Sequence, residues 1–210
     1  MKTKFAIGCL VQWYECDIIE EYVNSLKDAI NAYDGEIIVD FVISSNEELE
    51  KCVSAEKKNE CIQKIGSILL DFDNVRITNK LHTIADYRRK FNIKYCNKVD
   101  VLMWGESDAL IPQQTFNVLD SLHKQSIKIN NPKYLAFDNW WSLKYTMTQD
   151  EMNKINNKTE ELEVVTLPQH KFNGCGLVIS SEVIRAGVNI PKSVFFVHED
   201  SAFMYMTNKV

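Results

Sequence analysis

The sequence predicts one α/β domain over residues 1–210, with a mostly parallel central sheet that helices flank. Three nearly continuous apolar runs carry this prediction, at residues 5–11, 37–43 and 99–104. Such runs are typical of strands that are covered on both faces. Segments in which apolar residues recur at helical spacing separate the runs, and this alternation of strand and helix is the pattern of an open α/β sheet.

Helices are expected after each of these strands. Asp17 is suited to an N-cap position, with Glu20 three residues later as its capping-box partner, and a periodic apolar face follows. Residues 46–70 are expected to form a second helical region and residues 83–91 a short basic helix. Pro112 is expected to be the first residue of a further helix. Proline has no amide hydrogen, and the first residue of a helix does not need one for the hydrogen bonds within the helix.

The second half of the chain has a less regular pattern. Short apolar runs still indicate strands, and a polar segment between them has helical character. The expected elements are strands at 134–137, 162–167 and 175–179, a helix at 149–158, and a last helix at 181–186 that Gly187 terminates.

Composition and charge exclude several classes of protein. The hydrophobic content of 45% is that of a globular protein with a packed core. The net charge of −5 argues against a nucleic-acid-binding protein, and no apolar run approaches the roughly 20 residues of a membrane span. The six cysteines form no C-x-x-C pair and no leader-like segment opens the chain, so we expect reduced cysteines and a cytoplasmic location.

Two carboxylates, Glu106 and Asp108, follow directly after the apolar run that leads into Gly105. Ligands of open α/β sheets bind beyond the carboxyl ends of the strands, and two carboxylates that face a cleft there need a cation to neutralise them. Mg²⁺ and Mn²⁺ accept such oxygen ligands, and a metal at this point would bridge the phosphates of a nucleotide. Taken alone, the same residues also fit a solvated acidic turn.

Four blocks of sequence, in order, resemble those of GT-A-fold glycosyltransferases, especially family 2. The matching features are the opening strand and its loop, the Ala-Arg-Asn helix, the Asp-x-Asp strand, and the acceptor segment with its Glu-Asp motif. The blocks are I-G-C-L-V-Q-W-Y-E at 7–15, T-I-A-D-Y-R-R-K-F at 83–91, V-L-M-W-G-E-S-D-A-L-I-P at 101–112, and N-G-C-G-L-V-I-S-S-E-V-I-R-A-G at 173–187 followed by F-V-H-E-D at 196–200.

The resemblance implies a metal-dependent enzyme that transfers a sugar from a nucleotide-diphosphate donor to a glycan or other hydroxyl acceptor, with inversion. It implies that residues 1–125 bind the nucleotide sugar and that residues 126–210 bind the acceptor. Glu106 and Asp108 match the two metal-binding positions for Mn²⁺ or Mg²⁺, although the family has aspartate at the first. His198 is a candidate third metal ligand.

The resemblance also assigns the remaining roles. Asp200 is the favoured general base for the acceptor hydroxyl, with Glu199 second. Glu15 matches an acidic position of the family, but it also fits a residue that precedes a helix cap. The residues implied to bind the nucleotide sugar are Gln12, Trp13, Tyr14, Ser45, Asn46, Arg88 and Ser107.

Alternative interpretations stay open. Trp13 also fits a core position, and Arg88 also fits a surface cation pair with Arg89. The whole chain also fits a degenerate nucleotide-sugar or carbohydrate-binding module without turnover. A nucleotidyltransferase is less favoured, because no glycine-rich phosphate loop follows the first strand.

Overall fold

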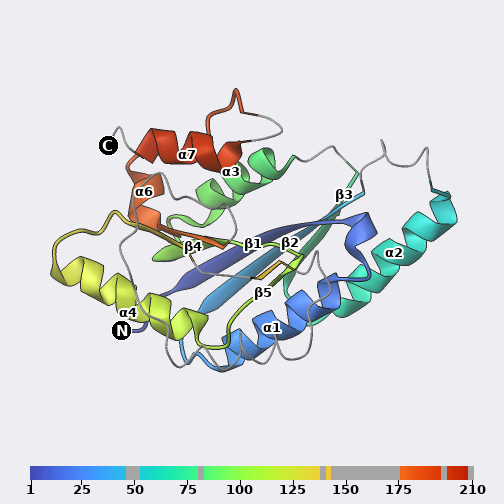
Figure 1. Cartoon of the computed structure of the whole chain (residues 1–210), viewed down its shortest axis with the longest axis horizontal. Helices are drawn as coiled ribbons and strands as arrows, with labels where there is room; N and C mark the ends of the chain where they lie inside the picture. Colours follow the sequence, from blue (N-terminus) through green and yellow to red (C-terminus); the bar gives the residue numbers. More distant parts are fainter. Residues whose placement is uncertain (46–52, 80–82, 138–140, 143–175, 195–197, 208–210) are drawn as a thin grey trace.

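A six-stranded sheet with helices on both faces forms the centre of the computed structural model (Figure 1). The structure describes residues 1–45, 53–79, 83–137, 141–142, 176–194 and 198–207. The strand order is β3-β2-β1-β4-β8-β6. The strands are β1 Phe5–Gln12, β2 Ile37–Ser44, β3 Asn74–Thr78, β4 Val101–Trp104, β6 Leu135–Phe137 and β8 Leu177–Ser180.

Strand directions confirm the expected, mostly parallel sheet. β1 pairs in parallel with both β2 and β4, and β2 pairs in parallel with β3. β8 is antiparallel to β4 and to β6, so among the described strands of this sheet β8 alone runs in the opposite sense and β6 again has the direction of β4. Two short strands, β5 Ala109–Leu110 and β7 Trp141–Ser142, form a separate antiparallel pair.

Helices lie on both faces of the sheet (Figure 1), and alternate residues of the central strands belong to two different core clusters. In β1, Phe5, Ile7 and Cys9 belong to one core cluster, whereas Ala6 and Leu10 belong to the other. This two-sided burial explains why the strands read as unbroken apolar runs. The first cluster lies beneath α1 Ile19–Asn31, α2 Ala55–Ile68 and α4 Thr115–Lys128, and the second beneath α3 Ile84–Tyr95, α6 Ser181–Arg185 and α7 Glu199–Thr207.

Two predicted helix starts are wrong. The N-cap of α1 is Ile18, which makes no side-chain cap, and Asp17 instead forms an ion pair with Lys64 of α2, with 2.8 Å between Nζ and Oδ1. A 3-10 turn over Trp13–Glu15 continues β1 and delays the helix, so Asp17 lies outside it. Pro112 precedes α4 by three residues, because its carbonyl accepts a turn hydrogen bond from the Thr115 amide (3.1 Å) and the helix begins there.

Other boundaries agree better with the sequence. Thr83 caps α3 by accepting a hydrogen bond from the Asp86 amide at 3.2 Å, and the helix continues to Tyr95. Gly187 follows α6 with a φ of 95°, as expected of a terminating glycine. α2 starts after Ser54, and the expected segments 149–158 and 162–167, with residues 46–52, lie outside the described residues. No helix in the described part of the chain is long and apolar enough to cross a membrane.

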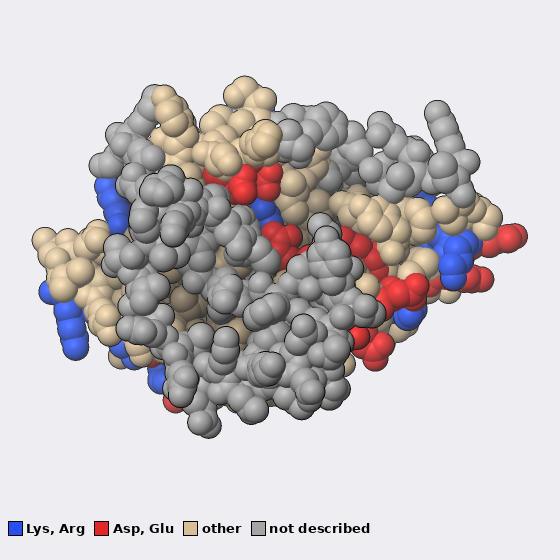
Figure 2. Space-filling view, in the orientation of Figure 1, with Lys and Arg blue, Asp and Glu red and all other residues tan. Residues whose placement is uncertain are grey.

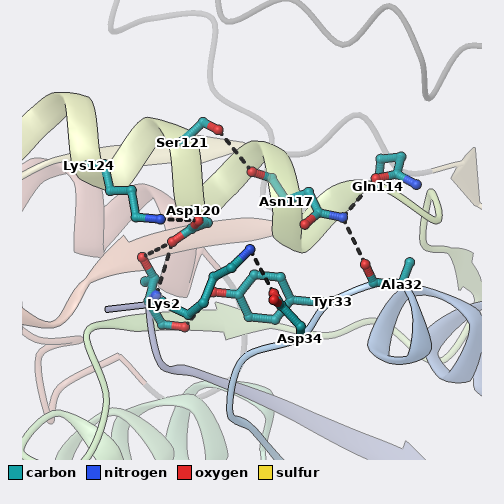
Figure 3. Close-up of polar contacts among 10 residues, drawn as sticks. Lys2, Ala32, Tyr33, Asp34, Gln114, Asn117, Asp120, Ser121 and Lys124 are labelled. Atoms are coloured by element: carbon teal, nitrogen blue, oxygen red, sulfur yellow. Dashed lines mark hydrogen bonds and ion pairs between the residues drawn. The ribbon is translucent and has the colours of Figure 1, made fainter.

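A buried aspartate, Asp120 of α4, fastens the start of β1 to this helix (Figure 3). Its Oδ1 accepts hydrogen bonds from the amide and the hydroxyl of Thr3, at 3.0 and 2.6 Å. Its Oδ2 accepts one from Lys124 Nζ at 2.6 Å. Burial opposes ionisation, but these donors outweigh it and lower the pKa of Asp120 to about 2. This network fixes the amino edge of the sheet, opposite the edge where the carboxyl ends of the parallel strands emerge.

Gly8, in the middle of β1, lets α3 lie directly on the sheet. A Cβ atom at this position would stand 2.5 Å from the ring of Phe91. Since Phe91 is buried between Tyr87 and Tyr95, with ring centroids 6.2 and 5.1 Å away, its ring has no room to retreat.

The substitution Gly8→Ala is therefore expected to lower the free energy of unfolding by about 1–3 kcal/mol through overpacking. Gly66→Ala is the matched control, because a Cβ at this position of α2 meets nothing within 4 Å. It should raise stability by about 0.5–1 kcal/mol through helix propensity. Urea denaturation followed by circular dichroism measures both. Equal stability of the two variants would show that the packing of α3 on the sheet does not require a residue without a side chain at position 8.

Candidate functional site

The candidate site lies where β1, β2 and β4 end, at one edge of the sheet. β4 ends at Trp104, and Gly105 keeps contact with β1 by donating its amide hydrogen to the Gly8 carbonyl at 2.7 Å. A side chain at Gly105 would stand 2.4 Å from the Tyr22 hydroxyl, so only glycine fits the point where the chain leaves the sheet. Glu106 and Asp108 follow, both partly buried, with the buried Ser107 between them.

Arg88 of α3 lies at the centre of this edge and is only 3% exposed. One guanidinium nitrogen donates a hydrogen bond to Glu199 Oε1 at 2.7 Å, and another donates to Glu106 Oε1. The guanidinium also lies over the ring of Trp104, 4.7 Å from its centroid. The three side chains Glu106, Arg88 and Glu199, called the Arg88 triad below, thereby join the end of β4, α3 and the start of α7.

Arg88 and Arg89 differ sharply in their surroundings. Arg89 donates hydrogen bonds to the carbonyls of Ile190, Pro191 and Val194 at 2.9–3.0 Å, so it holds the chain after α6 against α3. Neighbouring residues on a helix point about 100° apart, which explains why only Arg88 faces the site. The interpretation of Arg88 as half of a surface cation pair is wrong for this reason.

The sequence left two interpretations of Glu15 open, a site residue or a residue that precedes a helix cap. Its Oε2 accepts a hydrogen bond from the Gln12 amide and one from the Ser107 hydroxyl, both at 2.7 Å. Burial raises the pKa of Glu15 to about 7; its two hydrogen bonds oppose this, and the nearby charges of Asp108 and Glu106 add to it. Glu15 thus caps the 3-10 turn after β1 and also holds the turn after β4.

The carboxylates of the site outnumber its cations. Glu106 and Glu199 share the buried guanidinium of Arg88. Glu15 and Asp108 add two further carboxylates, which are near enough to Glu106 to interact with it or with each other. Burial raises the pKa of Glu106 even though Arg88 opposes that rise. In Figure 2 acidic side chains form a band from the upper centre of the face towards its right-hand end. An anionic diphosphate would be repelled here unless a cation arrived with it.

The end of β1 carries polar atoms that are buried and lack a hydrogen-bond partner in the described part of the chain. These are Gln12 Oε1 and Trp13 Nε1, and Ser44 Oγ on the neighbouring strand is a third. Trp13 is 4% exposed and belongs to the core cluster beneath α1, whereas Tyr14 is 51% exposed and meets Trp13 edge to face at 5.8 Å. Tyr14, and not Trp13, therefore offers an open ring face.

Ser45, which follows β2 and is a predicted nucleotide-sugar ligand, already has a hydrogen-bond partner within the protein. The amide and the hydroxyl of Ser45 both donate to the Thr78 carbonyl at 2.9 Å, so this hydroxyl supports the pairing with β3. Asn46 lies outside the described residues.

The start of α7 separates the two candidate bases. Glu199 is buried in the Arg88 triad. Asp200 is partly exposed, and its Oδ1 accepts a hydrogen bond from the Ser201 amide at 2.6 Å. His198 is exposed and has a φ of 61°, so the chain turns sharply just before the helix.

The donor set at this edge suits a metal ion that binds together with a ligand. Among the described residues no group of three or more His, Cys, Asp or Glu side chains is arranged to hold a metal. Mg²⁺ and Mn²⁺ are commonly held by one or two carboxylates, with substrate phosphates and water completing the shell. Asp108 and Glu106 fit that mode, because Arg88 already neutralises part of the charge on Glu106.

The pH dependence of stability tests the environment of Glu15. Its carboxyl ionises near 4.5 in the unfolded chain and near 7 in the folded protein, so the folded state binds more protons between these values and its stability falls as the pH rises. Glu15→Gln removes this loss, and the variant should gain stability relative to the wild type, by about 1–3 kcal/mol, between pH 4.5 and pH 7.5.

Urea denaturation across this pH range measures the difference. Glu56→Gln is the control, because Glu56 is exposed at the start of α2 and its loss should leave the profile of the wild type unchanged. Parallel pH profiles for the wild type and Glu15→Gln would contradict a buried Glu15 carboxyl.

No model of a known protein family matches the sequence, and no curated protein does. Similar solved structures include residues 1–349 of TarS from S. aureus, with a TM-score of 0.57 and 12% identity over 97% of this chain and 55% of that chain. A second TarS structure gives a TM-score of 0.62 and 13% identity over 97% of this chain and 33% of that chain. The mannosyltransferase PcManGT from Pyrobaculum calidifontis, in complex with GDP-Man and Mn²⁺, gives a TM-score of 0.55 and 12% identity over 97% of this chain and 51% of that chain.

The likeness to these structures confirms the GT-A-type fold that the sequence motifs predict. The chain spans about half, or less, of the length of the structures that it matches.

Proposed function

We propose that this chain is a glycosyltransferase that moves a sugar from a nucleotide-diphosphate donor to a hydroxyl acceptor with the help of Mn²⁺ or Mg²⁺. The observation that carries the proposal is the convergence of Glu15, Glu106 and Asp108 at the carboxyl edge of a GT-A-type sheet, where Glu106 also pairs with Arg88. PcManGT has been solved with GDP-Man and Mn²⁺, and TarS with UDP-GlcNAc, and both are similar to this chain in fold.

Asp108 is the proposed principal metal ligand, with Glu106 and His198 as secondary ligands. Glu106 is shared with Arg88, so it contributes less charge to a metal than Asp108 does. When bound, the metal would neutralise the charge that develops on the departing nucleotide diphosphate. Ser107, between the two carboxylates, is held by Glu15 and fixes the direction in which this turn leaves the sheet.

We propose that the nucleoside lies beside the turn after β1. Gln12 Oε1 and Trp13 Nε1 support this, because both are buried without a partner among the described residues, which is costly, and a ligand can satisfy them. Tyr14 offers the exposed ring for stacking. Ser45 and Asn46 remain secondary candidates at the end of β2.

Asp200 is the proposed general base, and Glu199 a positioning residue. A carboxylate that takes a proton from an acceptor hydroxyl must be reachable by that hydroxyl. Asp200 is partly exposed and meets this requirement, whereas Glu199 is buried against Arg88.

Asp108→Asn tests the metal site. The variant should fold normally but lose at least about tenfold in Mn²⁺-dependent affinity for a nucleoside diphosphate, because a neutral amide is a much weaker ligand for a hard cation. Isothermal titration with UDP and GDP, with and without Mn²⁺, measures this. Asp28→Asn, an exposed carboxylate on α1, is the matched control. Unchanged affinity of the Asp108 variant would remove this residue from the donor site.

Asp200→Asn and Glu199→Gln separate the two proposed roles. Asp200→Asn should leave the affinity for the donor unchanged and reduce turnover by about 10²–10⁴-fold, as expected for loss of a general base. Glu199→Gln should lower the free energy of unfolding by about 1–3 kcal/mol, because it removes one charge from the Arg88 triad.

Release of the nucleotide from UDP- and GDP-sugars measures turnover, and urea denaturation measures stability. A wild-type protein that binds nucleotide but releases none would indicate a binding module without turnover. A larger loss of turnover in Glu199→Gln than in Asp200→Asn would reverse the assignment of the base.

A further inference from the structure

Two buried cysteines face each other beside the candidate site. Cys16 directly follows the 3-10 turn Trp13–Glu15, and Cys61 lies on α2. Their sulfur atoms are 2.8 Å apart, with the Cys16 thiol donating to Cys61 Sγ. This is less than about 1 Å longer than the ~2.05 Å of a disulfide bond. Both are free thiols, and they are 4% and 5% exposed.

The neighbouring contacts keep the two sulfurs together. Asp17 follows Cys16, and Lys64 lies on α2 three residues after Cys61. These two residues form an ion pair at 2.8 Å, which also joins the segment after the 3-10 turn to α2. The other cysteines that the structure describes have different surroundings. Cys96 contacts a carbonyl of its own helix, that of Ile93 at 3.7 Å, and Cys9 is buried in β1.

We propose that Cys16 and Cys61 form a redox modification site, in which a small peroxide oxidises the two thiols to a disulfide that links the 3-10 turn to α2. A peroxide is the suitable oxidant because a larger disulfide reagent would not reach thiols as buried as these. Hydrogen peroxide itself is the simplest probe.

The reaction balances without any further reagent. The Cys61 sulfur, which accepts the hydrogen bond from Cys16, gives up its proton and attacks one peroxide oxygen to become a sulfenic acid, while the second oxygen takes a proton and leaves as water. The Cys16 sulfur then attacks the sulfenic sulfur, the S–S bond forms, and the hydroxyl departs as a second water. In total two thiols lose two electrons and two protons, and one peroxide becomes two waters.

The electrostatics of the pair make this reaction slow at neutral pH. Burial, and then the adjacent Cys61 thiol, raise the pKa of Cys16 above its usual range. Because Cys16 must lose its proton to attack the sulfenic sulfur, this second step is slow at neutral pH, and crosslinking should accelerate as the pH rises from 7 to 9.

The position of the pair gives the disulfide a consequence for the site. Glu15, the residue immediately before Cys16, accepts the hydrogen bonds from Gln12 and Ser107 that connect the turns after β1 and β4. A crosslink from Cys16 to α2 would restrict movement of that turn. Its effect on nucleotide binding rests on the proposed function, whereas the crosslink itself does not.

Peptide mapping of the whole chain tests the site. Reduced protein is treated with hydrogen peroxide at pH 7, 8 and 9, its remaining thiols are alkylated under denaturing conditions, and it is digested without reductant. Trypsin yields residues 5–27 and 59–64, and cleavage after Glu15 separates Cys9 from Cys16. We expect these peptides to be joined through Cys16 and Cys61, lighter by two hydrogen atoms than the two thiol peptides, in amounts that rise with pH.

Controls make the result decisive. Cys61→Ala should abolish the crosslink, and Cys96→Ala should leave it intact. The proposal is overturned if wild-type Cys16 and Cys61 are both fully alkylated after peroxide treatment at pH 9, or if the crosslink appears only when the protein is oxidised in denaturant. The mapping uses the wild-type chain, so it stands even if a variant fails to fold.

Comparison of the oxidised and reduced proteins separates this site from the proposed function. Oxidation should raise Tm by on the order of 10 °C, because the crosslink restricts the unfolded chain. It should also change the affinity for a nucleoside diphosphate with Mn²⁺. A crosslink that leaves this affinity unchanged would overturn the link to the donor site. A reduced protein that binds no nucleotide would contradict the proposed function but not the modification site.

Discussion

The buried guanidinium of Arg88 is the constraint on which the arrangement of the site depends. It joins Glu106 and Glu199, which are separated from it by 18 and 111 residues in the chain. Removal of Arg88 would leave the buried Glu199 and the partly buried Glu106 without their shared cation, and an unpaired buried charge is among the most costly defects in a protein. The start of α7 therefore lies against the end of β4 because one cation satisfies both.

The same guanidinium also sets the charge of the site. Glu15 and Asp108 add further carboxylates beside the Arg88 triad, and their effect reaches Cys9, whose pKa is raised well above its ordinary value by burial first and by these charges next. An edge with this excess of negative charge repels a phosphate and attracts a divalent cation. Under the proposed function, a metal bound with the diphosphate would remove this repulsion, because the cation would offset the negative charge of the carboxylates that repel the phosphates.

The elements that the sequence predicts well are those whose burial is uniform. β1, β2 and β4 are covered on both faces, so their apolar runs identify them directly. β3 was not anticipated, because this edge strand is only partly buried and its residues, N-V-R-I-T, lack such a run. The antiparallel direction of β8 was not predictable either, since an apolar run does not show which way a strand points.

The contacts of the site were less predictable, because they join residues far apart in the chain. Motifs indicated Glu106, Arg88 and Glu199 separately, but not that a single ion-paired network unites them. The Glu15–Ser107 bond and the Cys16–Cys61 contact span 92 and 45 residues. The sequence therefore left open whether Glu15 is a site residue or a residue that precedes a helix cap, because its two hydrogen-bond partners could not be identified from the sequence. Glu15 holds the turn after β1 to the turn after β4. If Asp108 holds the metal and the turn after β1 holds the nucleoside, as we propose, the two sites are mechanically coupled, and metal and nucleotide are expected to bind as a pair.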